Sequence, residues 1–162
     1  MLKGIDISKH NGKIDFEKIK NEVDFIMIRC AYRGIANRKI FKDISFEENI
    51  SNANYFNIPV GVYIYSTEIN SIEAAEEAEY CLNLVKNHNI QFPIVIDIED
   101  KKNQGNLSKS KMTEIVRSFC EKIENEGYYA MYYCSKDWYE NKINKEELKV
   151  YDLWLACWNS NK

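Results

Sequence analysis

Short apolar runs alternate along this chain with amphipathic stretches, and the alternation predicts most of its secondary structure. The apolar runs have the composition and spacing of β-strands. We expect six strands, within residues 3–10, 24–30, 60–65, 92–99, 128–134 and 151–158. Helices are expected to begin near Asp15, Ser45, Asn70, Ser108 and Lys136. Ser45 with Glu48, and Asn70 with Glu73, have the spacing of capping boxes.

The order of these elements indicates an α/β fold. The clearest helix covers 108–125 and places its apolar residues at helical spacing on one face, as a helix packed on a sheet does. Repeated strand–helix units predict parallel strands with right-handed crossovers, in either an open doubly wound sheet or a barrel. A glycine-rich phosphate loop does not follow the first strand. We therefore favour a TIM-like (β/α) barrel with an irregular sheet.

The fourth predicted strand ends in three carboxylates, in the run 93–100. Because side chains alternate along a strand, Asp97 and Glu99 share one face with Val95. Two neighbouring carboxylates in a partly apolar setting do not both ionise easily, so one of them can act as a proton donor. The alternative is a pair of solvated acids that opens a loop.

The first strand carries a further acid between isoleucines, Asp6. It is either a structural hydrogen-bonding group or part of a site, and its similarity to the fourth strand favours a site. In a barrel, the carboxyl ends of the strands hold the active site. Aromatic residues cluster at the same strand ends, which suits a sugar cleft, although about half of these rings are expected to fill the core: Tyr32, Tyr63, Tyr65, Tyr132, Tyr133, Trp154 and Trp158.

Composition narrows the class of protein. The 162 residues suit a single domain, and 22 basic against 25 acidic residues, without a basic stripe, argue against a nucleic-acid partner. No apolar stretch reaches the roughly 18 residues of a membrane span. Because the chain opens directly on a strand, we expect no signal peptide and synthesis in the cytoplasm. Five cysteines without a Cys-x-x-Cys pair indicate reduced, buried thiols and no zinc site, and His10 is the better histidine candidate for a site.

Several segments, taken in order, resemble the family 25 glycoside hydrolases, which are lysozymes that cut bacterial peptidoglycan. They are 4–8, 11–16, 24–29, 61–66, 97–99 and 153–156. The resemblance spans the whole chain. It implies an irregular barrel of eight strands that cleaves the β-1,4 bond from N-acetylmuramic acid to N-acetylglucosamine with retention, without a cofactor, at the bacterial cell wall.

The resemblance also implies roles for individual residues. Glu99 matches the general acid, Asp97 the acid that orients the reacting N-acetyl group or stabilises positive charge, and Asp6 a supporting aspartate. Tyr63 and Tyr132 match tyrosines near the substrate groove. From the aromatic residues at the strand ends, we also expect Tyr65 and Trp158 to contact the substrate. The segment 29–34 departs from the Lys-Ala-Thr-Glu-Gly-like run of many relatives.

Family members continue with two more strands and a further aspartate beyond the position of Lys162. We therefore expect residues 1–162 to form a single catalytic domain that is incomplete at its C-terminus, with an open barrel seam through which copies can self-associate. Two other functions stay open. One is a magnesium-dependent barrel hydrolase that uses the same three acids, and the other is a non-catalytic wall-binding fragment.

Overall fold

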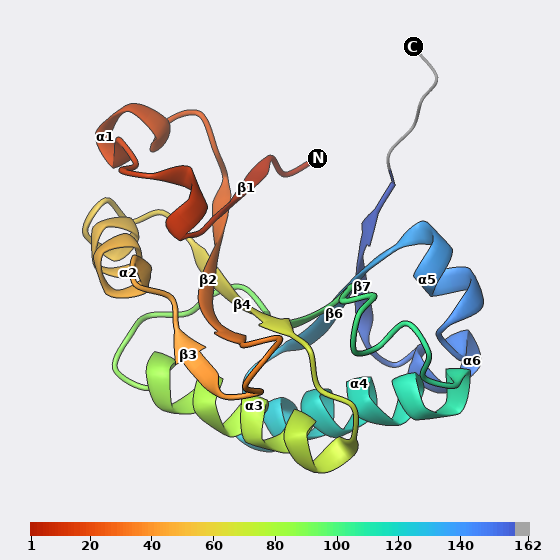
Figure 1. Ribbon diagram of the computed structural model, residues 1–162. Helices are drawn as coiled ribbons and strands as arrows, with labels where there is room; N and C mark the ends of the chain where they lie inside the picture. The colour runs from red at the N-terminus through yellow and green to blue at the C-terminus, as the bar shows by residue number, and fades with distance from the viewer. Residues whose placement is uncertain (158–162) are drawn as a thin grey trace.

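A curved parallel sheet forms the centre of the computed structural model, which describes residues 1–157 (Figure 1). Six parallel strands lie in the order β1-β2-β4-β5-β6-β7, and β3 pairs antiparallel with β2. The strands are β1 Gly4–Ile7, β2 Phe25–Arg33, β3 Ile40–Lys42, β4 Val60–Ser66, β5 Ile94–Ile98, β6 Ala130–Ser135 and β7 Asp152–Ala156. The sheet curls into a half-barrel, which confirms the predicted α/β barrel-like class and the pairing of the first strand with the second.

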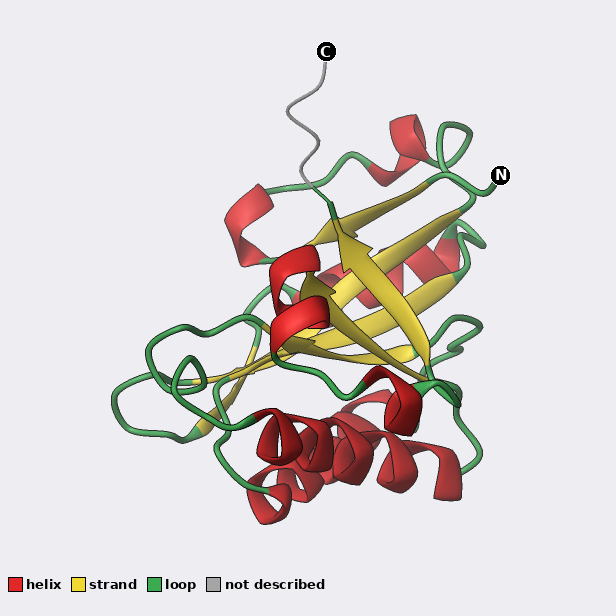
Figure 2. Cartoon of the chain, turned by 90° about the vertical axis from the view of Figure 1, so that its right-hand side faces the viewer, coloured by secondary structure: helices red, strands yellow, loops and turns green. Residues whose placement is uncertain are grey.

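Helices cover the convex face of the half-barrel (Figures 1 and 2). Most of this layer consists of α3 and α4, which pack against each other beneath the sheet, while α2 lies beside β2. The helices are η1 Lys9–Asn11, α1 Phe16–Ile19, α2 Phe46–Tyr55, α3 Ser71–Val85, α4 Lys109–Asn125, α5 Lys136–Asn141 and α6 Lys145–Leu148. None of the helices within residues 1–157 is long and apolar enough to cross a membrane.

Local sequence sets most of the helix starts. The side chains of Asn70, Ser108 and Ser135 accept hydrogen bonds from backbone N–H groups at the starts of α3, α4 and α5. The predicted capping box at Ser45 is wrong, because the Ser45 hydroxyl donates to Asp43 at 2.8 Å instead of capping α2. A buried aspartate two residues earlier in the chain competes successfully for this hydroxyl.

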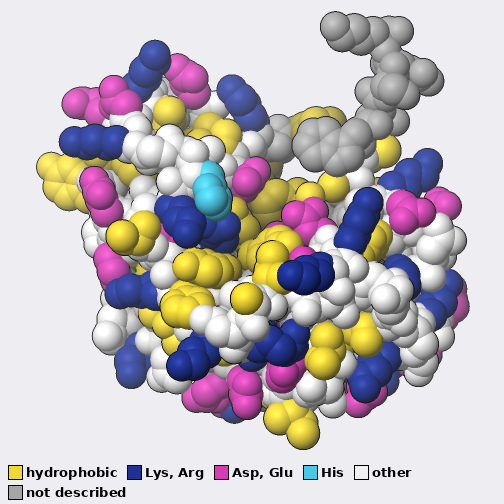
Figure 3. All heavy atoms as spheres, viewed as in Figure 1, with side chains coloured by type: hydrophobic (Ala, Val, Ile, Leu, Met, Phe, Trp, Pro, Cys, Tyr) yellow, Lys and Arg dark blue, Asp and Glu magenta, His cyan; other side chains and the backbone are white. Residues whose placement is uncertain are grey.

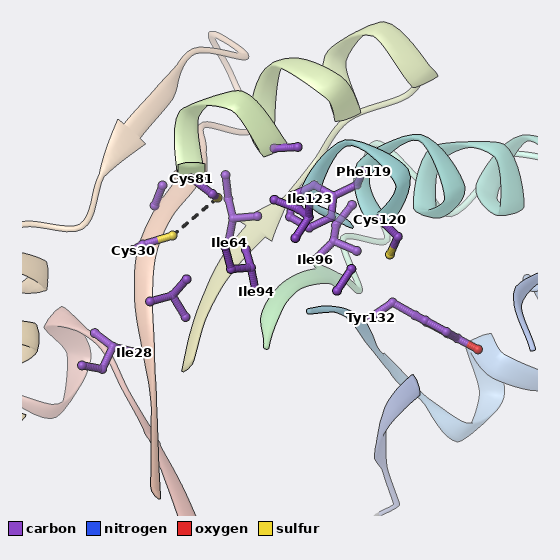
Figure 4. Packing of buried hydrophobic residues seen from close by; sticks show 14 of the residues in the cluster. Ile28, Cys30, Ile64, Cys81, Ile94, Ile96, Phe119, Cys120, Ile123 and Tyr132 are labelled. Carbon is purple, nitrogen blue, oxygen red and sulfur yellow. Dashed lines mark hydrogen bonds between the residues drawn. The ribbon is translucent and has the colours of Figure 1, made fainter. Parts of the chain in front are cut away.

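The hydrophobic core lies between the sheet and its helices (Figure 4). From the strands, Ile28, Ile64 and Ile96 point toward the helices, where α4 contributes Phe119 and Ile123. These side chains have no exposed surface, and each buried residue of this size contributes about 2 kcal/mol of hydrophobic free energy. The core therefore fixes which side chains of each strand face outward into the concave side.

A bulge interrupts the alternation of β2. Its register on β4 shifts between Arg29 and Ala31, so that Tyr32 pairs with Tyr65. The extra residue brings Arg29 and Tyr32 to the same side of the sheet, where the Arg29 guanidinium lies 5.5 Å from the Tyr32 ring centre. The structure thus extends this strand beyond the predicted end at residue 30 and adds β3, which the sequence pattern did not predict.

Candidate active site

A cavity of about 300 Å³ opens on the concave side at the carboxyl ends of the strands. Its walls come from β1, β2, β4, β5, β6 and β7 together with η1. They consist of Asp6, Ser8, His10, Arg29, Tyr63, Tyr65, Asp97, Glu99, Tyr133 and Trp154. Carboxylates, one guanidinium and aromatic rings converge here, as expected of a binding site for a polar ligand with apolar faces.

The three predicted acids meet in this cavity although they come from strands far apart in sequence. Asp97 and Glu99 lie two residues apart at the end of β5, and their shared face is the concave one. Asp6 reaches the same cavity from β1, which is three places away in the sheet. Asp97 is buried, whereas Asp6 and Glu99 are exposed to the open side of the cavity.

Burial shifts the pKa of both acids on β5 upward. Desolvation raises the pKa of Asp97 well above its usual range, the Glu99 charge adds to this shift, and the Arg29 guanidinium opposes it. Desolvation in the cavity wall also raises the pKa of Glu99. The sequence led us to expect repulsion from Asp97 as a cause of the Glu99 shift, but the repulsion falls mainly on Asp97 because this acid is the more deeply buried. At least one of the two carboxyl groups therefore keeps its proton at pH values above those at which a carboxyl group usually loses it.

Arg29 is a residue of this cavity that the sequence interpretation missed. Its Nε donates to Asp43 Oδ2 at 2.7 Å, and Asp43 is completely buried. Within residues 1–157, Arg29 Nη2 and Asp97 Oδ1 are both buried without a hydrogen-bond partner. An unpaired donor and an unpaired acceptor on walls of one cavity define a polar spot that a ligand group can satisfy. The sequence did not predict this role, because a single arginine within a strand does not form a recognisable motif.

Aromatic side chains from β4, β6 and β7 line much of the rest of the cavity. The Trp154 ring meets Tyr133 edge-on at 5.2 Å and Tyr63 at 6.3 Å, which joins β7 to β6 and β4 across the concave side. The Tyr65 hydroxyl donates to Asp100 Oδ1 at 3.4 Å. Desolvation raises the pKa of Tyr63, of Tyr65 and of Tyr133, the last to about 12, so the three phenols remain neutral donors.

The predicted substrate contact through Tyr132 is not supported by its position. This side chain is only 3% exposed and packs in the core near Cys120 of α4, on the side of the sheet away from the cavity (Figure 4). Its neighbour Tyr133 lines the cavity instead, because successive side chains of β6 alternate faces. Trp158, the other predicted contact at this end of the chain, lies outside the described residues.

Within the described range, 1–157, no group of three or more His, Cys, Asp or Glu side chains is arranged to hold a metal ion. Basic and acidic side chains are interspersed over the face that carries the opening of the half-barrel, without a basic stripe (Figure 3).

The fold and the cavity together define an α/β half-barrel protein with a carboxylate-rich site at the carboxyl ends of its strands. Comparison with known proteins identifies the family. The family model of the glycosyl hydrolases family 25 matches residues 5–162. The chain therefore belongs to the family 25 glycosyl hydrolases, as the resemblance in its sequence indicated.

Individual relatives agree with this assignment. The chain is 25% identical to an autolytic lysozyme from Clostridium acetobutylicum, over 99% of its own length and 46% of that protein. It is 25% identical to the modular autolysin LytC from Streptococcus pneumoniae, solved in complex with a synthetic peptidoglycan ligand, with a TM-score of 0.84 over 99% of this chain and 40% of LytC. A family 25 glycosyl hydrolase from Bacillus anthracis shares the fold, with 24% identity and a TM-score of 0.79 over 96% of this chain and 70% of the other. The chain thus spans less than half the length of each of the first two relatives.

Proposed function

We propose that this chain forms the catalytic part of a muramidase that hydrolyses the β-1,4 bond between N-acetylmuramic acid and N-acetylglucosamine in bacterial peptidoglycan. The observation that carries the proposal is the convergence of Asp6, Asp97 and Glu99 in one cavity with aromatic walls. Pyranose rings stack on aromatic faces, while carboxyl groups bind hydroxyls and transfer protons. The family and the relatives above favour this substrate, and the cell wall is the proposed place of action.

In this proposal Glu99 is the general acid. Its exposure to the open cavity lets it reach a glycosidic oxygen, and its raised pKa keeps a proton available for the leaving group. Once the leaving sugar has departed with that proton, the carboxylate of Glu99 can take a proton from the attacking water. The same residue thus serves first as acid and then as base.

Asp97 and Asp6 support the reacting sugar. Asp97 has a buried acceptor oxygen without a partner, which suits a hydrogen bond from the amide N–H of the N-acetyl group. That bond aligns the acetamide oxygen for attack on the anomeric carbon as the glycosidic bond breaks. Water then displaces the acetamide oxygen from the same carbon, and the two inversions together give retention, the outcome implied by the family resemblance. Asp6 adds negative charge to the same cavity from β1, where it favours the positive charge that develops on the sugar ring.

The test is incubation of the protein with purified peptidoglycan, followed by measurement of new reducing ends and identification of the sugar that carries them. We expect the new reducing ends to be on N-acetylmuramic acid. A chelator should leave the rate of their formation unchanged. A chelator-sensitive reaction would favour the magnesium-dependent alternative. Binding to walls without any new reducing ends would favour a wall-binding fragment, a function that the short coverage of the relatives keeps open.

A further inference from the structure

A second pocket, of about 400 Å³, opens beside the acid-lined cavity and shares His10, Arg29 and Tyr65 with it. Its remaining walls come from η1, from the carboxyl end of β2 and from the loop that follows β2. Because three side chains line both spaces, the two pockets lie next to each other. A ligand bound across the acids can therefore extend a substituent into the second pocket.

The wall of this second pocket is largely apolar. Tyr32 stacks on Phe41 with ring centres 5.5 Å apart, so its ring is held in place next to the pocket. Ile35, at the rim, is 42% exposed. The bulge in β2 is responsible for this arrangement, because it brings Tyr32 to the same side as Arg29. An apolar wall with a fixed aromatic ring suits a short organic chain better than a free inorganic anion.

Next to this wall lies one cationic side chain without an ion-pair partner among residues 1–157, Lys9. The two arginines of the pocket are each neutralised by a buried partner, Arg29 by Asp43 at 2.7 Å and Arg33 by Glu77 at 2.6 Å. The Lys9 ammonium lies 4.8 Å from the centre of the Tyr32 ring and, within residues 1–157, has no carboxylate at ion-pair distance. The pocket thus combines an apolar wall with a single positive charge that is free to bind an anionic group.

We infer that this pocket binds the carboxylate-bearing peptide stem that is attached through the lactyl group of N-acetylmuramic acid. The inference rests on the proposed function, since it needs the glycan to lie across the acids. The stem branches from the sugar, its small apolar side chains suit the Tyr32 wall, and its carboxylate suits Lys9. A polymer of phosphates is a poorer fit, because the negative charge of Asp6 repels a polyanion in the adjoining cavity.

The experiment is a binding titration, by nuclear magnetic resonance, with the disaccharide N-acetylglucosaminyl-N-acetylmuramic acid. This product lacks the bond to be cleaved, so turnover does not interfere. It is used in three forms: without a stem, with a peptide stem, and with the stem carboxylates amidated. Glycerol phosphate is a fourth ligand that tests for general anion binding. The proteins are the wild type, Lys9→Gln and Lys39→Gln, which removes an exposed charge outside the pocket.

The expected result is tighter binding of the stem-bearing disaccharide than of the other two forms. Lys9→Gln should weaken that binding by up to about fivefold, the upper end of the range for an exposed ion pair, and remove its dependence on salt. It should leave the stem-free form unchanged, and Lys39→Gln should behave like the wild type. Three results would overturn the inference and leave the muramidase proposal intact. They are equal binding of the stem-bearing and stem-free forms, an effect of Lys9→Gln on both forms, and binding of glycerol phosphate as tight as that of the stem-bearing form. Failure of every disaccharide to bind, together with intact walls, would overturn both.

Discussion

Arg29 and Asp43 form a buried ion pair that ties the candidate active site to the outer layer of the fold. Arg29 Nε donates to Asp43 Oδ2 at 2.7 Å, and the same oxygen accepts the backbone N–H of Lys9 at 3.3 Å. The other Asp43 oxygen accepts from the backbone and the hydroxyl of Ser45. One carboxylate therefore joins β2, η1 and the start of α2, and these hydrogen bonds hold its pKa below the usual range.

Removal of the guanidinium should separate the structural role of Arg29 from its role in the site. Arg29→Met leaves Asp43 buried without its cation, and we expect a loss of about 3 kcal/mol in the free energy of unfolding. Arg29→Lys keeps the charge and should recover part of this loss. Because the Arg29 charge lowers the pKa of Asp97, the carbon-13 carboxyl titration of Asp97 should move to higher pH in Arg29→Met and less in Arg29→Lys. An unchanged Asp97 titration in both variants would contradict the electrostatic role.

Glu99→Gln should abolish most of the catalytic activity without unfolding the protein. The amide keeps the shape of the side chain but cannot transfer a proton, so turnover on peptidoglycan should fall by about two or more orders of magnitude. Asp97→Asn should be nearly as damaging. Glu22→Gln is the matched control, since Glu22 is exposed and lies outside the cavity. Wall hydrolysis at the parental rate in Glu99→Gln would disprove the assignment.

Asp100 is a poor control for the same experiment, although it follows Glu99 directly and does not line the cavity. Its side chain is buried and accepts from the backbone and side chain of Asn103 at 2.8 and 2.7 Å. It also accepts from Tyr65, which does line the cavity. Asp100→Asn should therefore disturb the loop after β5, and a moderate loss of activity would reflect this disturbance rather than lost proton transfer.

The two neighbouring tyrosines of β6 should respond to mutation in opposite ways. Tyr132→Ala should cost about 3 to 5 kcal/mol of stability because it leaves a hole in the core, whereas Tyr132→Phe should leave glycan affinity unchanged. Tyr133→Ala removes a ring from the cavity wall and should weaken glycan binding. Calorimetric unfolding and titration with the disaccharide measure the two effects. Weaker glycan binding in Tyr132→Phe would restore the role first expected for this residue.

A buried pair of acids behind the site should make stability depend on pH. Glu68 and Glu77 are both completely buried, desolvation raises the pKa of each, and repulsion between them adds to the shift of Glu68. The folded protein therefore holds a proton that the unfolded chain releases. Its free energy of unfolding should fall as the pH rises above the ordinary value of 4.5, by up to about 1.4 kcal/mol per pH unit for one proton, until the folded-state pKa is passed.

Glu68→Gln should make this pH dependence shallower, because an amide has no proton to release. Urea denaturation at several pH values between about 4.5 and 8 measures the slope, and Glu22→Gln again serves as the exposed control. An identical slope in wild type and Glu68→Gln would show that the proton is held elsewhere.

The outer edges of β1 and β7 should promote self-association. Each of these strands has one partner within residues 1–157, and unpaired strand edges are templates for pairing with another chain. Sedimentation velocity should therefore detect concentration-dependent association. Leu155→Lys places a charge on β7 and should reduce it, while Ile72→Lys, at an exposed position on α3, should not. A monomer at every concentration would contradict this prediction.

The sequence by itself determined the order of the six parallel strands and of the longer helices between them, and the positions of the acids. The two-residue period of β5 puts Asp97 and Glu99 on one face, and parallel strands bring their carboxyl ends to one edge of the sheet, so Asp6 could be placed near them. These features are local or follow from general rules of α/β topology. The helical period of 109–125 likewise predicted the face of α4 that packs in the core.

Only the tertiary structure decided which strand faces point inward and which distant side chains meet. Alternation separates Tyr132 from Tyr133, but only the packing of α4 against β6 assigns Tyr132 to the core. The pairing of Arg29 with Asp43 spans 14 residues and depends on how β2 and the start of α2 come together. The bulge that puts Tyr32 beside Arg29 arises from the register between β2 and β4. The sequence of one segment cannot specify this register, because the register depends on how both strands pack together.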